Sequence, residues 1–194
     1  AGKGKKQAVK YAHNVYNEKT HTATSEIKTE IIVLDTKEFA DICYFIPCPK
    51  SPHGCDVDPT GEYIVGSGKL AALIPVFSFD KIQKAIADKA FEGDFEGIPV
   101  IKYEAALYGE VKKPGLGPLH TEFDGKGNAF TSMFVSSEVV KWNIKDLKVV
   151  DRAPTYCSVG HLYVPGGDSR KSNPKYMIAY NKITKDRYLP TGPE

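Results

Sequence analysis

The sequence predicts an all-β protein with one inserted helix. Three observations support this fold class: short runs of β-branched and aromatic residues recur along the chain, turn-forming residues separate them, and a single segment shows helical periodicity. With 194 residues, the chain is long enough for one domain of ordinary size or for part of a larger one.

Seven runs have the composition of strands, and turn sequences such as DPTG, DGKGN and GGDSRKSNP separate several of them. The runs are Thr29–Asp35, Cys43–Pro47, Glu62–Gly68, Ala71–Phe79, Ala129–Val135, Glu138–Ile144 and Tyr176–Lys182. The helix is predicted in FDKIQKAIADKAFEG, where four apolar side chains recur at helical spacing after a cap at Ser78 or Asp80. These side chains are Ile82, Ala85, Ile86 and Ala90.

Charge and hydropathy argue against two kinds of partner. The formal net charge of +2 is too small to indicate a nucleic-acid partner. No segment approaches the roughly 18–20 apolar residues that a membrane-spanning helix needs. The one basic run, AGKGKKQAVK, is expected to be a solvated or frayed end. Because the chain starts at Ala1 and stops after LPTGPE, we expect it to be a piece of a longer protein.

The four cysteines do not form a zinc-ribbon or thioredoxin motif, because no C-x-x-C pair is present. Cys43 and Cys48 lie in the apolar run ICYFIPCPK and are expected to be buried free thiols. A disulfide among the four stays open, and their number does not settle the redox compartment.

An internal repeat organises the chain. Each copy has a histidine, an aspartate-bearing turn, a strand, a small-residue turn and a second strand, and the copies begin at His53, His120 and His161. A period of roughly 40–50 residues with several short strands per unit is typical of β-propeller blades. We therefore expect residues 1–194 to form part of a propeller.

The repeat turns three separate histidines into one candidate site. Equivalent positions of successive blades converge on the same end of a propeller axis, so the side chains of His53, His120 and His161 are expected to gather there. Converging neutral imidazoles favour copper, zinc, iron or nickel. Two alternatives stay open: structural histidines in a non-catalytic binding module, and a mononuclear zinc hydrolase, which would need a nearby carboxylate base.

Other polar residues have simpler interpretations. Asp56, Asp58 and Asp124 are expected to be turn residues that bond nearby backbone amides. His13 and His21 lie outside the repeats and are expected at the surface, and Cys55 is expected to be a bystander beside His53.

Three blocks of the sequence resemble nitrous-oxide reductase. They are SPHGCDVDPTGEYIVGSGKL, GLGPLHTEFDGKGNAFTSMFVSSEVVKWNI, and SVGHL with NKITKDRYLPTGP. Their order and spacing agree with that family from about Ile31 onward. The wording CDVDPTGEYIV is closer to its Sec-exported branch than to its Tat-exported branch.

The resemblance implies a periplasmic enzyme that reduces N2O to N2 and water in the last step of denitrification. It implies a seven-bladed propeller with a tetranuclear copper–sulfide cluster held by seven histidines, and a cupredoxin domain with a dinuclear copper centre. It further implies a head-to-tail homodimer, a periplasmic electron donor such as a c-type cytochrome, and calcium.

Residue by residue, His53, His120 and His161 match three of the seven cluster ligands. Lys182 in NKITKDR matches a lysine close to the cluster, which could orient or protonate bound oxygen and whose backbone is associated with calcium. Tyr16 and Glu18 in VYNEK resemble a calcium loop, with the glutamate displaced by one position. The other ligands and the cupredoxin domain are absent, so residues 1–194 alone are expected to be inactive.

Overall fold

The computed structural model describes residues 5–17, 22–33, 42–167, 169 and 171–182. The chain forms two compact units: Ala1–Phe45 with Asp94–Pro99, and Ile46–Gly93 with Val100–Glu194. The described residues are mostly strands in antiparallel sheets, which confirms the predicted all-β class. No helix among them is long and apolar enough to cross a membrane.

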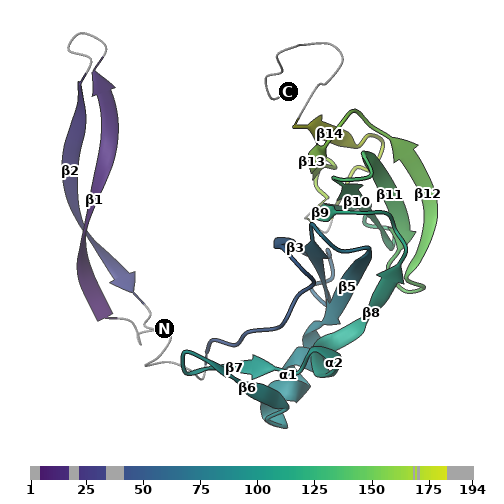
Figure 1. The fold of residues 1–194 in the computed structure, drawn as a ribbon, viewed down its shortest axis with the longest axis horizontal. Coiled ribbons are helices and arrows are strands. Elements are labelled where there is room, and N and C mark those ends of the chain that lie inside the picture. The colour runs from purple at the N-terminus through teal and green to yellow at the C-terminus, as the bar shows by residue number, and fades with distance from the viewer. Residues whose placement is uncertain (1–4, 18–21, 34–41, 168, 170, 183–194) are drawn as a thin grey trace. The chain divides into compact units, whose positions relative to one another are not determined.

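The smaller unit contains an antiparallel hairpin of β1 (Lys5–Asn17) and β2 (Thr22–Val33) (Figure 1). The expectation of a frayed end was wrong for residues 5–10, because they pair with residues 28–33 of β2. Ala8, Val9 and Tyr11 follow or flank the lysines of this segment, and this apolar content is compatible with a strand. The strand predicted at residues 29–35 is present as far as Val33; residues 34 and 35 lie outside the described ones, as does His21.

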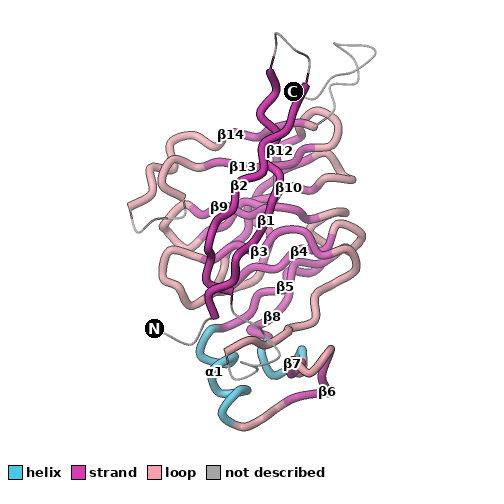
Figure 2. Tube along the Cα trace, turned by 90° about the vertical axis from the view of Figure 1, so that its left-hand side faces the viewer, coloured by secondary structure: helices cyan, strands magenta, loops and turns pink. Residues whose placement is uncertain are grey.

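The larger unit contains two four-stranded sheets and one strand pair, all antiparallel (Figures 1 and 2). The first sheet has the order β3-β4-β5-β8, and the second has the order β9-β10-β11-β12. The first contains β3 (Pro52–Val57), β4 (Tyr63–Gly68), β5 (Leu73–Ser78) and β8 (Leu107–Lys112). The second contains β9 (Pro118–Phe123), β10 (Asn128–Met133), β11 (Glu138–Asn143) and β12 (Lys148–Pro154).

The third group pairs β13 (Val159–Tyr163) with β14 (Ile178–Asn181). A further hairpin, β6 (Phe91–Phe95) with β7 (Ile98–Ile101), is divided between the two units. Each repeat therefore begins with a new sheet or strand pair, and its histidine lies in the first strand of that group.

Two helices, not one, interrupt the strands in the described part of the chain. The predicted helix is α1 (Phe79–Ala87), and Ser78 caps it by accepting a hydrogen bond from the Lys81 amide at 3.1 Å. It ends before Ala90 because Lys89 adopts a positive φ of 52°. The second helix, α2 (Tyr103–Ala106), has only four residues, too few to show helical periodicity.

The segment Cys43–Pro47 is not the predicted strand. Only Phe45 forms an isolated bridge there, with its amide donating to the Pro99 carbonyl at 3.0 Å. Pro47 and Pro49 remove the backbone donors that a longer ladder would need. Cys43 is half-buried and Cys48 is exposed, so the prediction of two buried thiols was wrong for Cys48.

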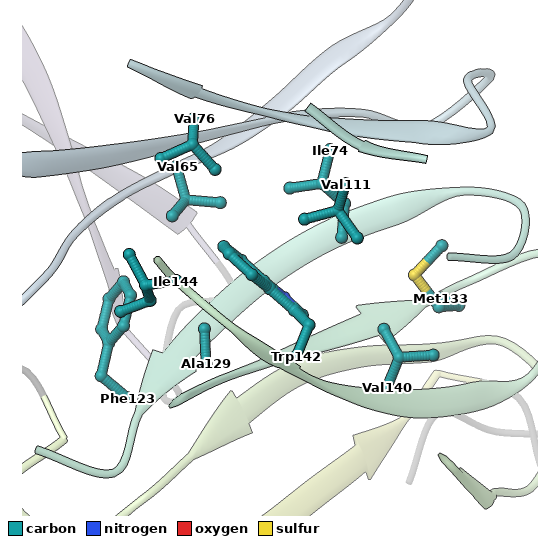
Figure 3. Close-up of a cluster of buried hydrophobic side chains, with 10 residues drawn as sticks. All are labelled: Val65, Ile74, Val76, Val111, Phe123, Ala129, Met133, Val140, Trp142 and Ile144. Atoms are coloured by element: carbon teal, nitrogen blue, oxygen red, sulfur yellow. The ribbon is translucent and has the colours of Figure 1, made fainter. Parts of the chain in front are cut away.

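The main core of the larger unit contains side chains from both four-stranded sheets (Figure 3). Trp142 of β11 is fully buried there, and its Nε1 donates to Thr131 Oγ1 of β10 at 2.9 Å. The other members of the cluster are Val65, Ile74, Val76, Val111, Phe123, Ala129, Met133, Val140 and Ile144. Burial of this apolar surface fixes the two sheets against each other and so positions the first strands β3 and β9.

Candidate metal centre

Each of the three repeat histidines lies in a β-bulge. From Pro52 to Cys55, β3 advances three residues while β4 advances two, from Gly68 to Gly66. The same three-against-two pairing occurs on β9 between Pro118 and Thr121, where β10 advances from Met133 to Thr131. It occurs again on β13 between Val159 and Leu162, opposite Asn181 and Ala179 of β14. A bulge redirects a side chain from the regular pleat.

The bulges bring the three imidazoles together. The ring centroids of His53 and His120 are 4.8 Å apart and their planes are perpendicular, with an interplanar angle of 90°. The rings of His120 and His161 are stacked, with centroids 4.0 Å apart and planes 21° from parallel. His120 is the half-buried middle member, and His53 and His161 are exposed.

Polar bridges hold β3 against β9 directly beside two of the histidines. Ser67 Oγ accepts from the Gly54 amide and donates to the Leu119 carbonyl, both at 2.6 Å. Gly54 follows His53 and Leu119 precedes His120. A Cβ at Gly54 would collide with the Leu119 carbonyl, so this close approach of the two strands requires glycine.

Asp56 forms a second bridge between the same strands. Its Oδ2 accepts from the Thr121 amide of β9 at 2.8 Å. Burial raises the pKa of the Asp56 carboxyl, while the Thr121 hydrogen bond and nearby His161 act in the opposite direction. Asp56 is therefore an inter-strand bridge and not the predicted turn residue.

Burial and nearby charges favour the neutral forms of His53 and His120. Burial lowers the pKa of His120 to about 4, with further lowering from His161, His53 and Lys182. Burial also lowers the pKa of His53, and Lys182, His161 and Lys69 add to the effect. His120 Nε2 is buried and has no hydrogen-bond partner among the residues that the structure describes. A neutral imidazole with a buried, unpaired nitrogen suits a metal ion.

Two lysines lie beside the histidines, on the aromatic ring of Phe134. The Nζ atoms of Lys69 and Lys182 lie 4.2 Å and 5.6 Å from its centroid. Gly160, next to His161, makes room for the Lys182 stem, because a Cβ there would be 2.6 Å from Lys182 Cε. Neither lysine forms an ion pair within the described part of the chain.

The other predicted site residues lie elsewhere or in undescribed positions. Asp58 accepts hydrogen bonds from Thr60 and Tyr63, and Asp124 accepts from Lys126 and Asn128, so both are the turn residues that the sequence predicts. Tyr16 lies in β1 opposite Ala23, and the structure describes only its backbone. Glu18 lies outside the described residues.

Sequence reasoning missed the residues that support the histidines: Ser67, Asp56 and Lys69. Ser67 and Lys69 lie in GSGKL at the end of the first repeat's strand, where the glycine-rich pattern indicates only a turn. The role of Ser67 depends on Leu119 of β9, which is 52 residues away along the chain, and that of Lys69 depends on Phe134. A single sequence carries no local signal for such a contact.

The three imidazoles are neighbours and do not form a preformed site for one ion. Within the described ranges, no three His, Cys, Asp or Glu side chains are placed to hold a single metal ion. The ring stacking explains this, since lone pairs lie in the ring planes and parallel rings direct them side by side. This arrangement suits adjacent metal ions better than one shared ion.

Comparisons with known proteins agree with the repeat. The family model "Nitrous oxide reductase propeller repeat" matches residues 152–194. The nitrous-oxide reductase of Stutzerimonas stutzeri is 34% identical over 159 residues, which cover 77% of this chain and 23% of that protein. The nitrous-oxide reductase of Ralstonia nicotianae is 33% identical over 185 residues, which cover 90% of this chain and 25% of that protein. The nitrous-oxide reductase of Cupriavidus necator is 35% identical over 160 residues, which cover 77% of this chain and 23% of that protein.

The chain thus spans about a quarter of the length of the curated relatives it matches. The solved structure of Kuenenia stuttgartiensis hydrazine synthase superposes on this chain with a TM-score of 0.49 at 10% sequence identity. The superposition covers 69% of this chain and 30% of that one. The propeller repeat match and the succession of antiparallel sheets support the predicted β-propeller architecture.

Proposed function

The chain belongs to the nitrous-oxide reductase family, and from this premise we propose that it supplies part of a copper site that reduces N2O. His53, His120 and His161 would be ligands of a tetranuclear copper–sulfide cluster. The reaction consumes N2O, two electrons and two protons, and it yields N2 and water. This reaction is the last step of denitrification.

The stacked pair of His120 and His161 is the observation that best supports this proposal. Its centroid separation of 4.0 Å is close to the about 3.5–4 Å between metal ions in two-metal sites. Two parallel imidazoles at this spacing can each ligate a different ion of one cluster. A mononuclear zinc hydrolase would require the opposite arrangement, with lone pairs directed at a single point.

The chain's own contribution is to hold neutral imidazoles rigidly. The bulges aim the rings, and Ser67 and Asp56 fix β3 to Leu119 and Thr121, the two neighbours of His120 in β9. Burial and the neighbouring positive charges keep His120 unprotonated at neutral pH, so its lone pair is available without prior loss of a proton. Copper, when bound, would bind N2O and deliver the electrons.

Lys182 would act on the oxygen end of the substrate. Its ammonium lies close enough to lower the pKa of both His53 and His120, and its stem is positioned by Gly160. From there Nζ can orient the oxygen of N2O or donate one of the two protons that water formation requires. Lys69 would add positive charge at the same edge.

Further parts of the proposal follow from family membership. They are a periplasmic location, a homodimer, a periplasmic donor such as a c-type cytochrome, a dinuclear copper centre in a cupredoxin domain, and a calcium site involving Tyr16, Glu18 and the Lys182 backbone.

The direct test compares His120→Ala with His13→Ala in the intact protein, because His13 lies in β1 of the other unit. Copper per chain and N2O turnover are measured for both. We expect His120→Ala to lose cluster copper and turnover, and His13→Ala to keep both. Wild-type copper and turnover in His120→Ala would refute the proposal and leave the histidines with a structural role in a non-catalytic module.

A further inference from the structure

Two cysteines lie on the opposite side of β3 and β4 from the Ser67 and Asp56 bridges. The segment around Cys48 and Pro49 runs over two glycines of β4. A Cβ at Gly68 would be 2.8 Å from Pro49 Cβ, and a Cβ at Gly66 would be 3.4 Å from Cys48 Sγ. The missing side chains of these glycines make room for the segment.

Cys55 lies directly opposite Gly66 in the pairing of β3 with β4. Opposed residues in an antiparallel pair present their Cβ positions on the same face, about 4.5–5.5 Å apart. Cys48 Sγ contacts one of these positions and therefore lies within reach of the Cys55 side chain. Both cysteines are free and exposed.

We propose that Cys48 and Cys55 form a reversible disulfide, which closes residues 48–55 into a covalent ring that contains His53. The oxidant is an external disulfide. The thiolate of one cysteine attacks it, forming a mixed disulfide and releasing one thiol, and the second cysteine then displaces the other thiol. The two protein thiols lose two electrons and two protons, and the external disulfide gains them.

The disulfide would restrict the backbone that leads into the β-bulge at His53. In the reduced protein, Pro49 and Pro52 restrict this segment, and its Lys50 and Ser51 carbonyls accept hydrogen bonds from the Leu70 and Lys69 amides. In the oxidised protein, both ends of the segment that holds His53 are linked covalently. The proposal does not rest on copper binding, so it can hold even where the proposed function fails.

The test treats the intact protein with glutathione disulfide and maps the products by mass spectrometry without reduction. We expect a cross-linked peptide joining Cys48 to Cys55, with a mass lower by two hydrogen atoms, while Cys43 and Cys157 remain unlinked. Trypsin cleavage after Lys50 then leaves the two pieces joined until a reductant is added. In Cys48→Ser, Cys55 should retain a glutathione adduct, because no partner thiol displaces it.

A second variant tests the geometry. Gly66→Ala places a methyl group 3.4 Å from Cys48 Sγ and 3.2 Å from Phe77 Cε2, so it should slow formation of the cross-link. Accumulation of glutathione adducts on Cys48 or Cys55 of the wild-type protein would overturn the proposal. So would a bridge from either cysteine to Cys43 or Cys157, or two thiols that stay unmodified.

Discussion

The imidazole of His120 stacks on that of His161, with ring centroids 4.0 Å apart and an interplanar angle of 21°. His120 belongs to β9 of the second sheet and His161 to β13 of the next strand pair. Each ring leaves its strand at a β-bulge, so the contact depends on irregularities that recur in both repeats. Four properties of this site and of the sheets that support it can be measured.

The Ser67 hydroxyl should contribute measurably to stability. Ser67→Ala removes the bonds to Gly54 and Leu119, so the half-buried Gly54 amide and the buried Leu119 carbonyl lose this partner, which costs about 1–3 kcal/mol. Denaturant unfolding of the intact protein should show this loss. Ser169→Ala is the matched control, because its hydroxyl bonds the Gly166 carbonyl at the surface and should change little. Equal stabilities for the two variants would contradict the bridge.

The core between the sheets should depend on Trp142. Trp142→Ala empties a fully buried site and should lower the free energy of unfolding by about 3–5 kcal/mol. Trp142→Phe should cost less, since it retains apolar bulk and loses the hydrogen bond to Thr131. Leu70→Ala, at a residue that is 59% exposed, serves as the control. Thermal and denaturant unfolding report all three, and an effect of Trp142→Ala no larger than that of the control would be inconsistent with this core.

His120 should make the metal-free protein sensitive to acid. Its pKa is about 4 in the folded protein and about 6.5 in an unfolded chain, so between these values the unfolded state binds more protons. The stability that His120 contributes is present above pH 6.5 and is lost as the pH falls toward 4. Imidazole NMR titration measures the pKa directly, and protonation of His120 near pH 6.5 would contradict the assignment.

Lys182 should affect turnover more than copper content. Lys182→Met removes the ammonium, and since positioned proton donors contribute about 10²–10⁴-fold, turnover should fall by about 10²-fold or more. Gly160→Ala should also lower turnover, because the new methyl group displaces the Lys182 stem. Lys175→Met is the control, since its ammonium lies over Tyr176. Turnover of Lys182→Met equal to wild type would exclude a role for this lysine.

Much of the fold could be predicted from local pattern. The strands β4, β5, β10 and β11 are runs of β-branched and aromatic residues, and the Ser78 cap follows from its position before an amphipathic turn. The first strands of the repeats were missed because Pro, Gly and His dilute their strand character and bulges break their alternation. The helix α2 was missed because four residues carry no period.

Only the part of the candidate site that recurs in the repeat, its three histidines, could be predicted from the sequence. Equivalent positions in three copies identified His53, His120 and His161, and the propeller geometry predicted that their side chains converge. The bulges could not be predicted, because a bulge is defined by the partner strand. Ser67 and Asp56 act across two sheets, so their roles appear only once β3 packs against β9.

We expect these three histidines to bind copper in one cluster. Anomalous diffraction from crystals of the intact protein, measured at the copper edge, locates the copper atoms. Copper peaks are expected about 2 Å from a ring nitrogen of His53, His120 and His161, with separate copper atoms on the stacked pair. Copper found only at other positions, with water bonded to His120 Nε2, would contradict it.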